Sequence, residues 1–285
     1  MSLASLRPKA RYFPVKPGPL RMQPGLSRFG VDFGNGSVDA LFFQRDPETP
    51  RYLAAKAAVL ARHPERFAWL DGDAEQRALE HVTRWIEARA QLEHAGDAPP
   101  EGPWQTRFEA LARATAEDIV VIARDAGGQE RAILVHVCFP SGWRPEAILG
   151  QSFLQIHAPV PELEAIQRSA SALVDALIER GPYVRFVWTV SADDRLDHHP
   201  DHGRTDAWSR DTTRGFLRVE RQVTVPLPEV GASLFLIRTY LYAFDELTAA
   251  ERALLGDVLR ETSPAVLAYK GLHESLPHVL RALTT

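Results

Sequence analysis

The sequence predicts an α+β protein in which one antiparallel sheet is accompanied by helices. Three observations support this prediction. Short apolar runs rich in β-branched residues recur in the second half of the chain, apolar residues at helical spacing occur before, between and after them, and short turns join neighbouring runs as in hairpins. With 285 residues, the chain is long enough for one large domain or two closely joined ones with a sizeable core.

The first part of the chain is expected to be an arm followed by helices. Residues 1–45 are rich in proline and glycine, and we expect them to lie over the surface of a single domain formed by 46–285, with one short strand at "ALFF" (40–43). Helices are expected between 50 and 95 and again at about 104–115. Within 50–95, the stretch "DAEQRALEHVTRWIEARAQL" has one apolar face, made by Leu79, Val82, Trp85 and Ile86.

Strands are expected from residue 117 onward. The runs "DIVVIA" and "RAILVHVCF" flank the turn "DAGGQE" and predict a hairpin. "SFLQIHAPV" (152–160) is interpreted as a third strand and "YVRFVWTV" (183–190) as a fourth. Two longer runs, "GFLRVERQVTVPL" and "SLFLIRTYLYAF", are joined by the turn "PEVG". We therefore expect about five or six strands.

Helices also separate and follow the strands. The stretch "PELEAIQRSASALVDALIERG" (161–181) has an apolar stripe at helical spacing, and the Gly-Pro pair at its end is expected to stop the helix. Further along the chain, Thr248 and Glu251 have the spacing of a capping box, which predicts a helix beginning there.

The composition excludes several classes of protein. A net charge of −4 gives no overall positive field for nucleic acid or an anionic membrane surface. The single cysteine, Cys138, excludes a disulfide framework, a cysteine-ligated iron–sulfur cluster and a cysteine-rich zinc site. The N-terminal stretch lacks the apolar segment of a signal peptide, and no run of about 18 apolar residues occurs, so we expect a cytoplasmic protein without membrane spans.

Strand periodicity gives the arginines of "FLRVERQVTV" two environments. Alternation places Arg221 on an apolar face, whereas Arg218 and Glu220 point to the other face. A buried guanidinium requires a partner, because its desolvation alone is unfavourable by several kcal/mol. The partner is either an internal carboxylate or an anionic ligand such as a cofactor carboxylate. Arg238, in "LIRTY", is a second candidate of the same kind.

Two histidines stand in apolar runs. His157 lies in "IHAPVP" (156–161), and His136 lies in "ILVHVCF". His157 is interpreted either as a core or groove histidine with one hydrogen-bonded nitrogen, or as a neutral imidazole at a pocket wall, which haem iron accepts as an axial ligand. His136 has the more apolar neighbours and is more typical of a core histidine.

Two polar clusters have alternative interpretations. Glu117 and Asp118 are either a solvated acidic turn or pocket carboxylates that hold a cationic substrate. "DHHPDHG" (197–203) contains His198 and His202 four residues apart, but the proline between them favours a loop, and a zinc site needs three or four converging ligands. A solvated loop is therefore the favoured interpretation of this stretch.

Familiar catalytic motifs are absent from the sequence. It contains no G-x-G-x-x-G between a strand and a helix, no Walker A motif, no G-x-S-x-G elbow and no H-E-x-x-H. Ser141, in "FPSGW", is expected in a turn without an evident base, which disfavours a hydrolase. A redox enzyme with this sequence would need reducing equivalents from another protein.

Six motifs occur in the order of a known family and at plausible spacing. They are "AEDIVVI" (116–122), "VCFPSGWRP" (137–145), "IHAPVP" (156–161), "VRFVW" (184–188), "LRVERQ" (217–222) and "FLIRTYL" (235–241). In this ordered set the chain resembles the haem-dependent oxidative N-demethylase alpha subunit family, over about half its length. The resemblance implies a PAS-like antiparallel sheet with flanking helices around a haem pocket, and oxidative removal of a methyl group from a small secondary amine with dioxygen.

The resemblance also implies a partner protein, and on this premise the residue patterns supply candidate site residues. Electrons would come from a separate reductase subunit with flavin and an iron–sulfur cluster, and the cofactor would be haem b. His157 is expected to be the axial metal ligand, with Trp188 of "VRFVW" beside the cofactor. Arg221, Arg238 and Arg218 are expected to pair with the propionates, and Glu117 or Asp118 to hold an alkylammonium group.

One departure from the family pattern keeps other functions open. The fourth predicted strand has Val187 where the family tends to have asparagine, and valine cannot form a side-chain hydrogen bond. The alternatives to an enzyme are a haem-PAS sensor or small-ligand binding protein without turnover, and a scaffold subunit that has kept the fold and lost the cofactor.

Overall fold

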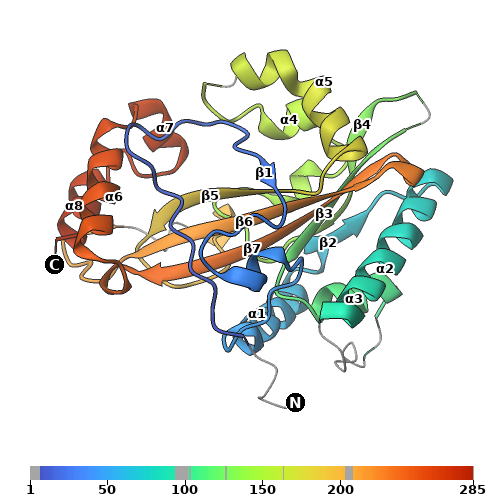
Figure 1. The fold of residues 1–285 in the computed structure, drawn as a ribbon, viewed down its shortest axis with the longest axis horizontal. Helices are drawn as coiled ribbons and strands as arrows, with labels where there is room; N and C mark the ends of the chain where they lie inside the picture. Colours follow the sequence, from blue (N-terminus) through green and yellow to red (C-terminus); the bar gives the residue numbers. More distant parts are fainter. Residues whose placement is uncertain are drawn as a thin grey trace.

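A seven-stranded antiparallel sheet forms the centre of the computed structural model, with strand order β1-β5-β6-β7-β3-β4-β2 (Figure 1). The structure describes residues 7–93, 102, 104–125, 127–162, 164–202 and 208–284. The strands are β1 (Ser27–Arg28), β2 (Phe67–Trp69), β3 (Asp118–Arg124), β4 (Glu130–His136), β5 (Tyr183–Ser191), β6 (Phe216–Leu227) and β7 (Ala232–Ala243).

Eight α-helices in the described part of the chain surround this sheet. They are α1 (Thr49–Arg62), α2 (Asp73–Glu93), α3 (Arg107–Arg113), α4 (Phe153–His157), α5 (Glu164–Glu179), α6 (Ala249–Glu261), α7 (Pro264–Tyr269) and α8 (Leu276–Ala282). Figure 1 shows α4 and α5 on one side of the sheet and α1, α2 and α3 on the other. The α+β prediction, with an antiparallel sheet and flanking helices, is confirmed.

The pairing of β6 with β7 fixes the two faces of the sheet. All twelve residues of each strand are in register, and Arg221 lies directly opposite Arg238. Successive side chains of a strand point to opposite faces. We call the face that carries Arg221 and Arg238 the covered face, and the face that carries Arg218 and Glu220 the open face.

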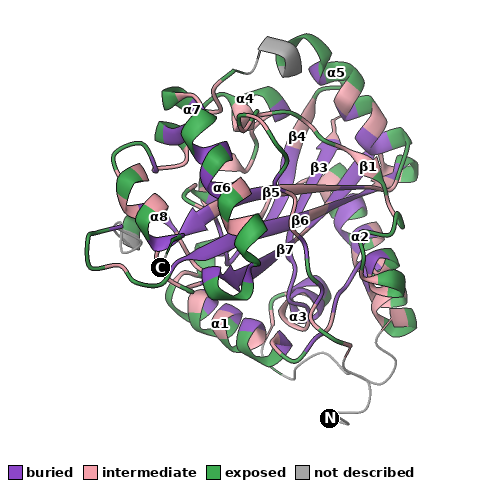
Figure 2. Ribbon diagram, turned by 60° about the vertical axis from the view of Figure 1, so that its left-hand side comes forward, coloured by how far each residue is buried: buried purple, intermediate pink, exposed green. Residues whose placement is uncertain are grey.

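The covered face is closed by the N-terminal arm and by most of the helices. Phe42 and Phe43 of the arm pack with α2 in one buried cluster, and Tyr12 packs with α6 in a second. The purple strands in the middle of Figure 2 lie beneath this cover. The arm predicted at 1–45 therefore contributes core side chains where the structure describes it.

The open face is covered only in part. Helices α4 and α5 pack on β3, β4 and β7 through an apolar cluster that includes Phe153, Val174 and Phe235, and α5 also lies against β6. On β5 and on the rest of β6, the open face carries polar side chains, several of which are only half-buried. This half-buried region is the part of the sheet that could meet a ligand.

Two segments that were expected to be strands are not strands, and one of them is a helix instead. "SFLQIHAPV" forms the helix α4, because the Ser152 hydroxyl accepts from Gln155 N–H and the Gln155 side chain accepts from Ser152 N–H, a capping box. "ALFF" adopts no strand. The hairpin of β3 and β4, the long β6–β7 pair and the helix start at Thr248 agree with the sequence.

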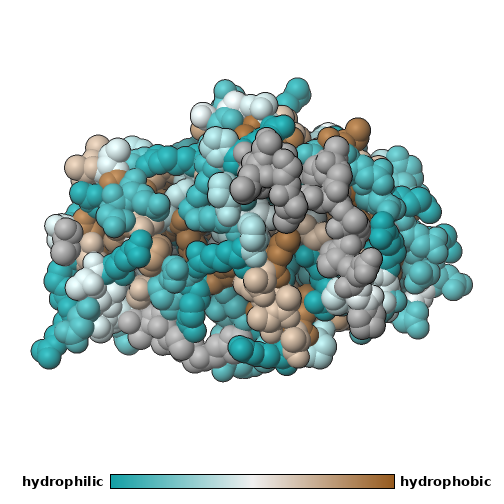
Figure 3. All heavy atoms as spheres, turned by 90° about the horizontal axis from the view of Figure 1, so that it is seen from below, coloured by the Kyte–Doolittle hydropathy of each residue, from teal (hydrophilic) through white to brown (hydrophobic). Residues whose placement is uncertain are grey.

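The surface carries few large exposed apolar side chains. Hydrophilic residues predominate on the face seen in Figure 3, with hydrophobic residues in small groups between them. Two of the exposed large apolar side chains, Leu154 in α4 and Tyr269 in α7, belong to segments next to the half-buried region of the open face. Among the described helices, none combines the length and apolar composition that crossing a bilayer requires.

Asp39 anchors the arm, and its removal is expected to destabilise the protein. Its buried carboxylate accepts from Tyr12 Oη (2.7 Å), Phe33 N–H (2.7 Å) and Asn35 N–H (3.1 Å). Each buried hydrogen bond to a charged group contributes about 1.5–3 kcal/mol. We expect Asp39→Ala to lower the free energy of unfolding by about 3 kcal/mol or more, measured by urea denaturation. The exposed Asp257→Ala serves as control, and equal stability of the two variants would contradict this role.

Candidate functional site

A line of polar side chains runs across the open face of β5 and β6. Arg218 Nε donates to Ser141 Oγ at 2.7 Å, and Ser141 Oγ in turn donates to the Glu220 carboxylate. Gln222 Nε2 donates to the other oxygen of Glu220 at 2.9 Å. Both oxygens of Glu220 are thus occupied by neutral donors.

Half-buried positions mark where the open face is accessible. Strand β5 presents Arg185, Val187 and Thr189 there, all half-buried. On its covered face Val184, Trp188 and Val190 are buried, and Phe186 is half-buried. Opposite them in the register, Gln222 and Ile237 are also half-buried. With two residues of α4, these form what we call the open-face site: Ile156, His157, Arg185, Val187, Gln222 and Ile237.

His157 contributes an imidazole whose two nitrogens have different surroundings. As the last residue of α4, it places Nδ1 2.7 Å from the carbonyl oxygen of Phe153, four residues earlier. That bond requires Nδ1 to carry the proton, which leaves a lone pair on Nε2. Within the described residues, no hydrogen bond to Nε2 is present. Burial lowers the pKa of His157, the bond to Phe153 raises it and Arg185 lowers it, so the ring is neutral near pH 7.

Two basic side chains lie on the same side of the sheet as His157. Burial lowers the pKa of Arg185, while Glu220 and Tyr269 raise it. Lys270, which follows α7, donates from Nζ to the Trp188 carbonyl at 2.9 Å. Burial lowers the pKa of Lys270 to about 8; Glu220 raises it and Arg185 lowers it. The open-face site is therefore bordered by cations.

The structure does not bring Arg221, Arg238 and Trp188 together with His157. All three side chains lie on the covered face. Arg221 donates to the carbonyls of residues 39 and 41 in the arm, and Arg238 pairs with Asp46 at 3.1 Å. Arg218 is on the open face, where Ser141 and three backbone carbonyls accept its hydrogen bonds.

The acidic pair is buried and has internal partners. Glu117 accepts from Gln44 N–H at 2.9 Å. Asp118 accepts from the N–H groups of Cys138 and Phe139, and its carboxylate lies 3.7 Å from Lys56 Nζ. Burial raises the pKa of Asp118 to about 6, while Lys56 and the two N–H groups lower it. The solvated-turn interpretation is wrong, because both residues are 1% exposed.

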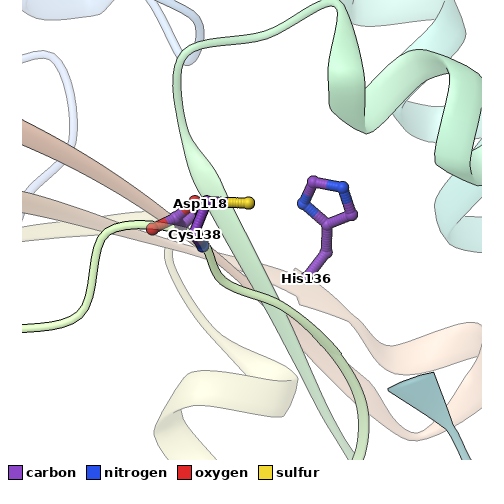
Figure 4. Close-up of side chains that lie close together, drawn as sticks. All are labelled: Asp118, His136 and Cys138. Atoms are coloured by element: carbon purple, nitrogen blue, oxygen red, sulfur yellow. Dashed lines mark hydrogen bonds between the residues drawn. The ribbon is translucent and has the colours of Figure 1, made fainter. Parts of the chain in front are cut away.

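Asp118 also belongs to a buried group with the chemistry of a metal site. Figure 4 shows Asp118, His136 and Cys138 close together, with the Cys138 sulfur towards the His136 ring. His136 is 0% exposed, and neither ring nitrogen has a hydrogen-bond partner in the described structure. Charge balance argues against a divalent ion, because Asp118 and Lys56 already neutralise each other, and binding through a thiolate would leave a net positive charge in the core.

The histidine-rich loop forms ion pairs of its own. His199 Nε2 lies 3.1 Å from the Glu146 carboxylate, and Asp201 lies close to both residues. Arg144 binds both oxygens of Asp201. The side chain of His202, one of the two histidines considered as metal ligands from the sequence, lies outside the described residues. The described contacts tie this loop to the segment after β4.

Sequence reasoning missed three residues of this region. Arg185 stands in "VRFVW" two residues before Val187, so strand alternation places both on one face. That this face is the one with Glu220 follows from the pairing of β5 with β6. Ser141 was treated only as a possible nucleophile, yet it links Arg218 to Glu220. Lys270 gave no signal, because its approach to β5 depends on the turn after α7.

The comparison with protein families gives one match. A family model described as "Haem-dependent oxidative N-demethylase, alpha subunit-like" matches residues 48–280. The match spans most of the chain, from the first helix to the last, and it includes every residue of the open-face site.

The buried Lys56–Asp118 pair gives a test of charge balance in the core. Asp118→Asn is expected to destabilise the protein by about 3–5 kcal/mol, because it leaves the Lys56 ammonium buried without its counter-charge. The double variant Lys56→Met/Asp118→Asn should recover part of this loss. The measurement is urea denaturation of the wild type, Lys56→Met, Asp118→Asn and the double variant. Strictly additive effects of the two substitutions would show that the pair is not coupled.

Proposed function

The chain belongs to the haem-dependent oxidative N-demethylase alpha subunit-like family, and from this premise we propose that it binds haem b at the open-face site and acts in oxidative N-demethylation. The observation that carries the proposal is the state of His157. Its Nδ1–H is bonded to a backbone carbonyl, and its Nε2 lone pair has no partner among the described residues.

This arrangement is the one that metal-binding histidines commonly have. A histidine ligand usually donates its second N–H to a carboxylate or a backbone carbonyl, which fixes the ring and makes the other nitrogen a better ligand. In this chain the Phe153 carbonyl has that role. We propose that His157 would hold the haem iron through Nε2.

The neighbouring side chains suit a flat apolar group. Ile156 of α4, Val187 of β5 and Ile237 of β7 are half-buried apolar residues of the same site. Their contact with a macrocycle would remove apolar area from water, at about 25 cal/mol per Å². They would also limit the access of water to the reacting atoms. The proposal includes a PAS-like fold for this sheet and its helices, and this part of it rests on the family membership.

The proposed reaction is a dioxygen-dependent demethylation of a small secondary amine. When bound, haem supplies the oxygen chemistry, and the protein supplies binding, orientation and the electrostatic environment. The substrate R–NH–CH3 and O2, with two electrons and two protons, would give R–NH2, formaldehyde and water. The electrons would come from a separate reductase subunit, in keeping with a family named for an alpha subunit.

The role of Glu117 and Asp118 in holding the amine receives no support from their contacts. Their carboxylates are engaged inside the protein, and the substrate would have to displace Gln44 N–H or Lys56 to reach them. Glu220, 8% exposed, lies on the open face and accepts a hydrogen bond from Gln222 of the open-face site. The proposal therefore does not depend on Glu117 or Asp118 as substrate ligands.

Haem binding can be tested with the purified protein. On titration with haem, the wild type is expected to give a Soret band shifted from that of free haem, with one haem per chain. His157→Ala should lose the spectrum of the histidine-ligated form and bind at least about tenfold more weakly. The exposed His273→Ala should behave as wild type. An unchanged spectrum in His157→Ala would remove this residue as the ligand.

Turnover gives a separate prediction. With a chemical or enzymatic reductant and dimethylamine as probe, the haem-loaded wild type should release formaldehyde only when dioxygen is present, measured by a colorimetric formaldehyde assay. Boiled protein and anaerobic samples serve as controls. Haem binding without formaldehyde release for any small N-methylamine offered would refute the demethylase part of the proposal.

A further inference from the structure

We propose that Arg185 and Lys270 form a carboxylate-binding subsite at the edge of the open-face site, and that they bind the acid side chains of the cofactor. This inference rests on the proposed function for the identity of the ligand. It assigns to two residues outside the sequence-based candidates the role that was expected of Arg221, Arg238 and Arg218.

Arg185 has an unused donor in a buried position. Its Nε is buried and has no hydrogen-bond partner within the described residues, although the side chain as a whole is half-buried. A buried donor without a partner is unfavourable by about 1–3 kcal/mol, and more for a charged group. An anion placed beside the guanidinium would supply the missing acceptor, and arginine can bind a carboxylate through two parallel hydrogen bonds.

Lys270 is a second cation with spare donors. An ammonium group has three hydrogens to donate, and the described contacts provide Nζ with one acceptor, the Trp188 carbonyl. Lys270 Nζ reaches β5 at the Trp188 carbonyl, close to Arg185 on the same strand, and Arg185 lowers the pKa of Lys270. Two like charges in a half-buried position favour an anion between them.

The acidic residue nearby does not provide that anion by hydrogen bonding. Glu220 accepts from Ser141 and Gln222 on its two oxygens, and it acts on Arg185 and Lys270 only through its charge. Arg218 is a third cation in this part of the open face, and the carboxylates that act on it are Glu220, Asp118 and Asp193. Arg218 already donates to four acceptors. Arg185 and Lys270 are therefore the two cations that a bound anion would neutralise.

Several other arginines also have buried nitrogens that lack a hydrogen-bond partner among the described residues. Of the three arginines expected at the propionates, Arg238 is the one in this group, and its situation differs from that of Arg185. Its guanidinium, however, lies 3.9 Å from the centre of the Tyr52 ring and pairs with Asp46, and the residue is 0% exposed on the covered face. A ligand would have to displace Asp46, or Tyr52 of α1, to reach it. Arg185 shares its face with His157, whose pKa it lowers, so a metal ligand and a carboxylate subsite lie in one region.

The test compares haem with its dimethyl ester, in which both carboxylates are blocked. The wild type and each variant are titrated with haem and with the ester, and binding is followed by the change in the Soret band. For the wild type, we expect the ester to bind at least about tenfold more weakly than haem, which corresponds to about 1.4 kcal/mol. Arg185→Gln and Lys270→Gln should each weaken haem binding by a similar factor and change ester binding less than about twofold.

The controls separate this inference from the proposed function. Arg210→Gln removes the same charge from an exposed side chain and should leave both affinities unchanged. If the wild type bound neither porphyrin, the proposed function would fail. If it bound both equally well, or if the variants lost haem and ester alike, haem binding would stand and the carboxylate subsite would be refuted.

A measurement on the wild type alone covers the case in which a variant does not fold. Acetylation of lysine side chains, followed by mass spectrometry, should be slower at Lys270 when haem is bound than when its dimethyl ester is bound. The exposed Lys16 should react equally in both samples. Equal protection of Lys270 by the two porphyrins would count as a refutation of the contact.

Discussion

Two buried arginines that face each other across β6 and β7 constrain the rest of the structure. Arg221 and Arg238 are directly opposite in the register and are both almost completely buried. Like charges in this relation are destabilising unless other groups compensate them. The compensation comes from the arm and from Asp46 just before α1: backbone carbonyls of the arm accept from Arg221, and Asp46 pairs with Arg238.

The arginine pair explains why the N-terminal segment folds across the sheet. Proline and glycine content predicts a surface arm, but it does not say where the arm lies. The carbonyls of Asp39 and Leu41 meet Arg221, and the ring of Phe29 lies 5.6 Å from its guanidinium. The arm thus closes the face that carries the arginine pair. The opposite face over β5 and β6 remains half-buried, so the position of the candidate site follows from the covering of the other face.

Much of this architecture could be predicted from the sequence, because strand alternation is a local property. The separation of Arg221 from Arg218 and Glu220 follows from period two, and the structure confirms it. What alternation cannot tell is which face is closed. That depends on contacts between Arg221 and a segment about 180 residues earlier. The sequence left an internal carboxylate or an anionic ligand as the partner of the buried arginine. In the structure, Arg221 donates to backbone carbonyls of the arm, and the carboxylate pair is formed by Arg238 with Asp46.

The segment 152–160 was expected to be a strand, but it forms the helix α4, and this difference affects the candidate site. A short apolar run does not distinguish a strand from a helical turn. The spacing of Ser152 and Gln155, which form a capping box, is the local feature that favours the helix. The helix matters to the chemistry, because the carbonyl four residues before His157 points along the helix towards the ring. A strand would direct that carbonyl to a neighbouring strand instead. The property that makes His157 a suitable metal ligand, one nitrogen bonded and the other left with its lone pair, thus follows from the helical conformation of a segment whose apolar pattern is equally typical of a strand.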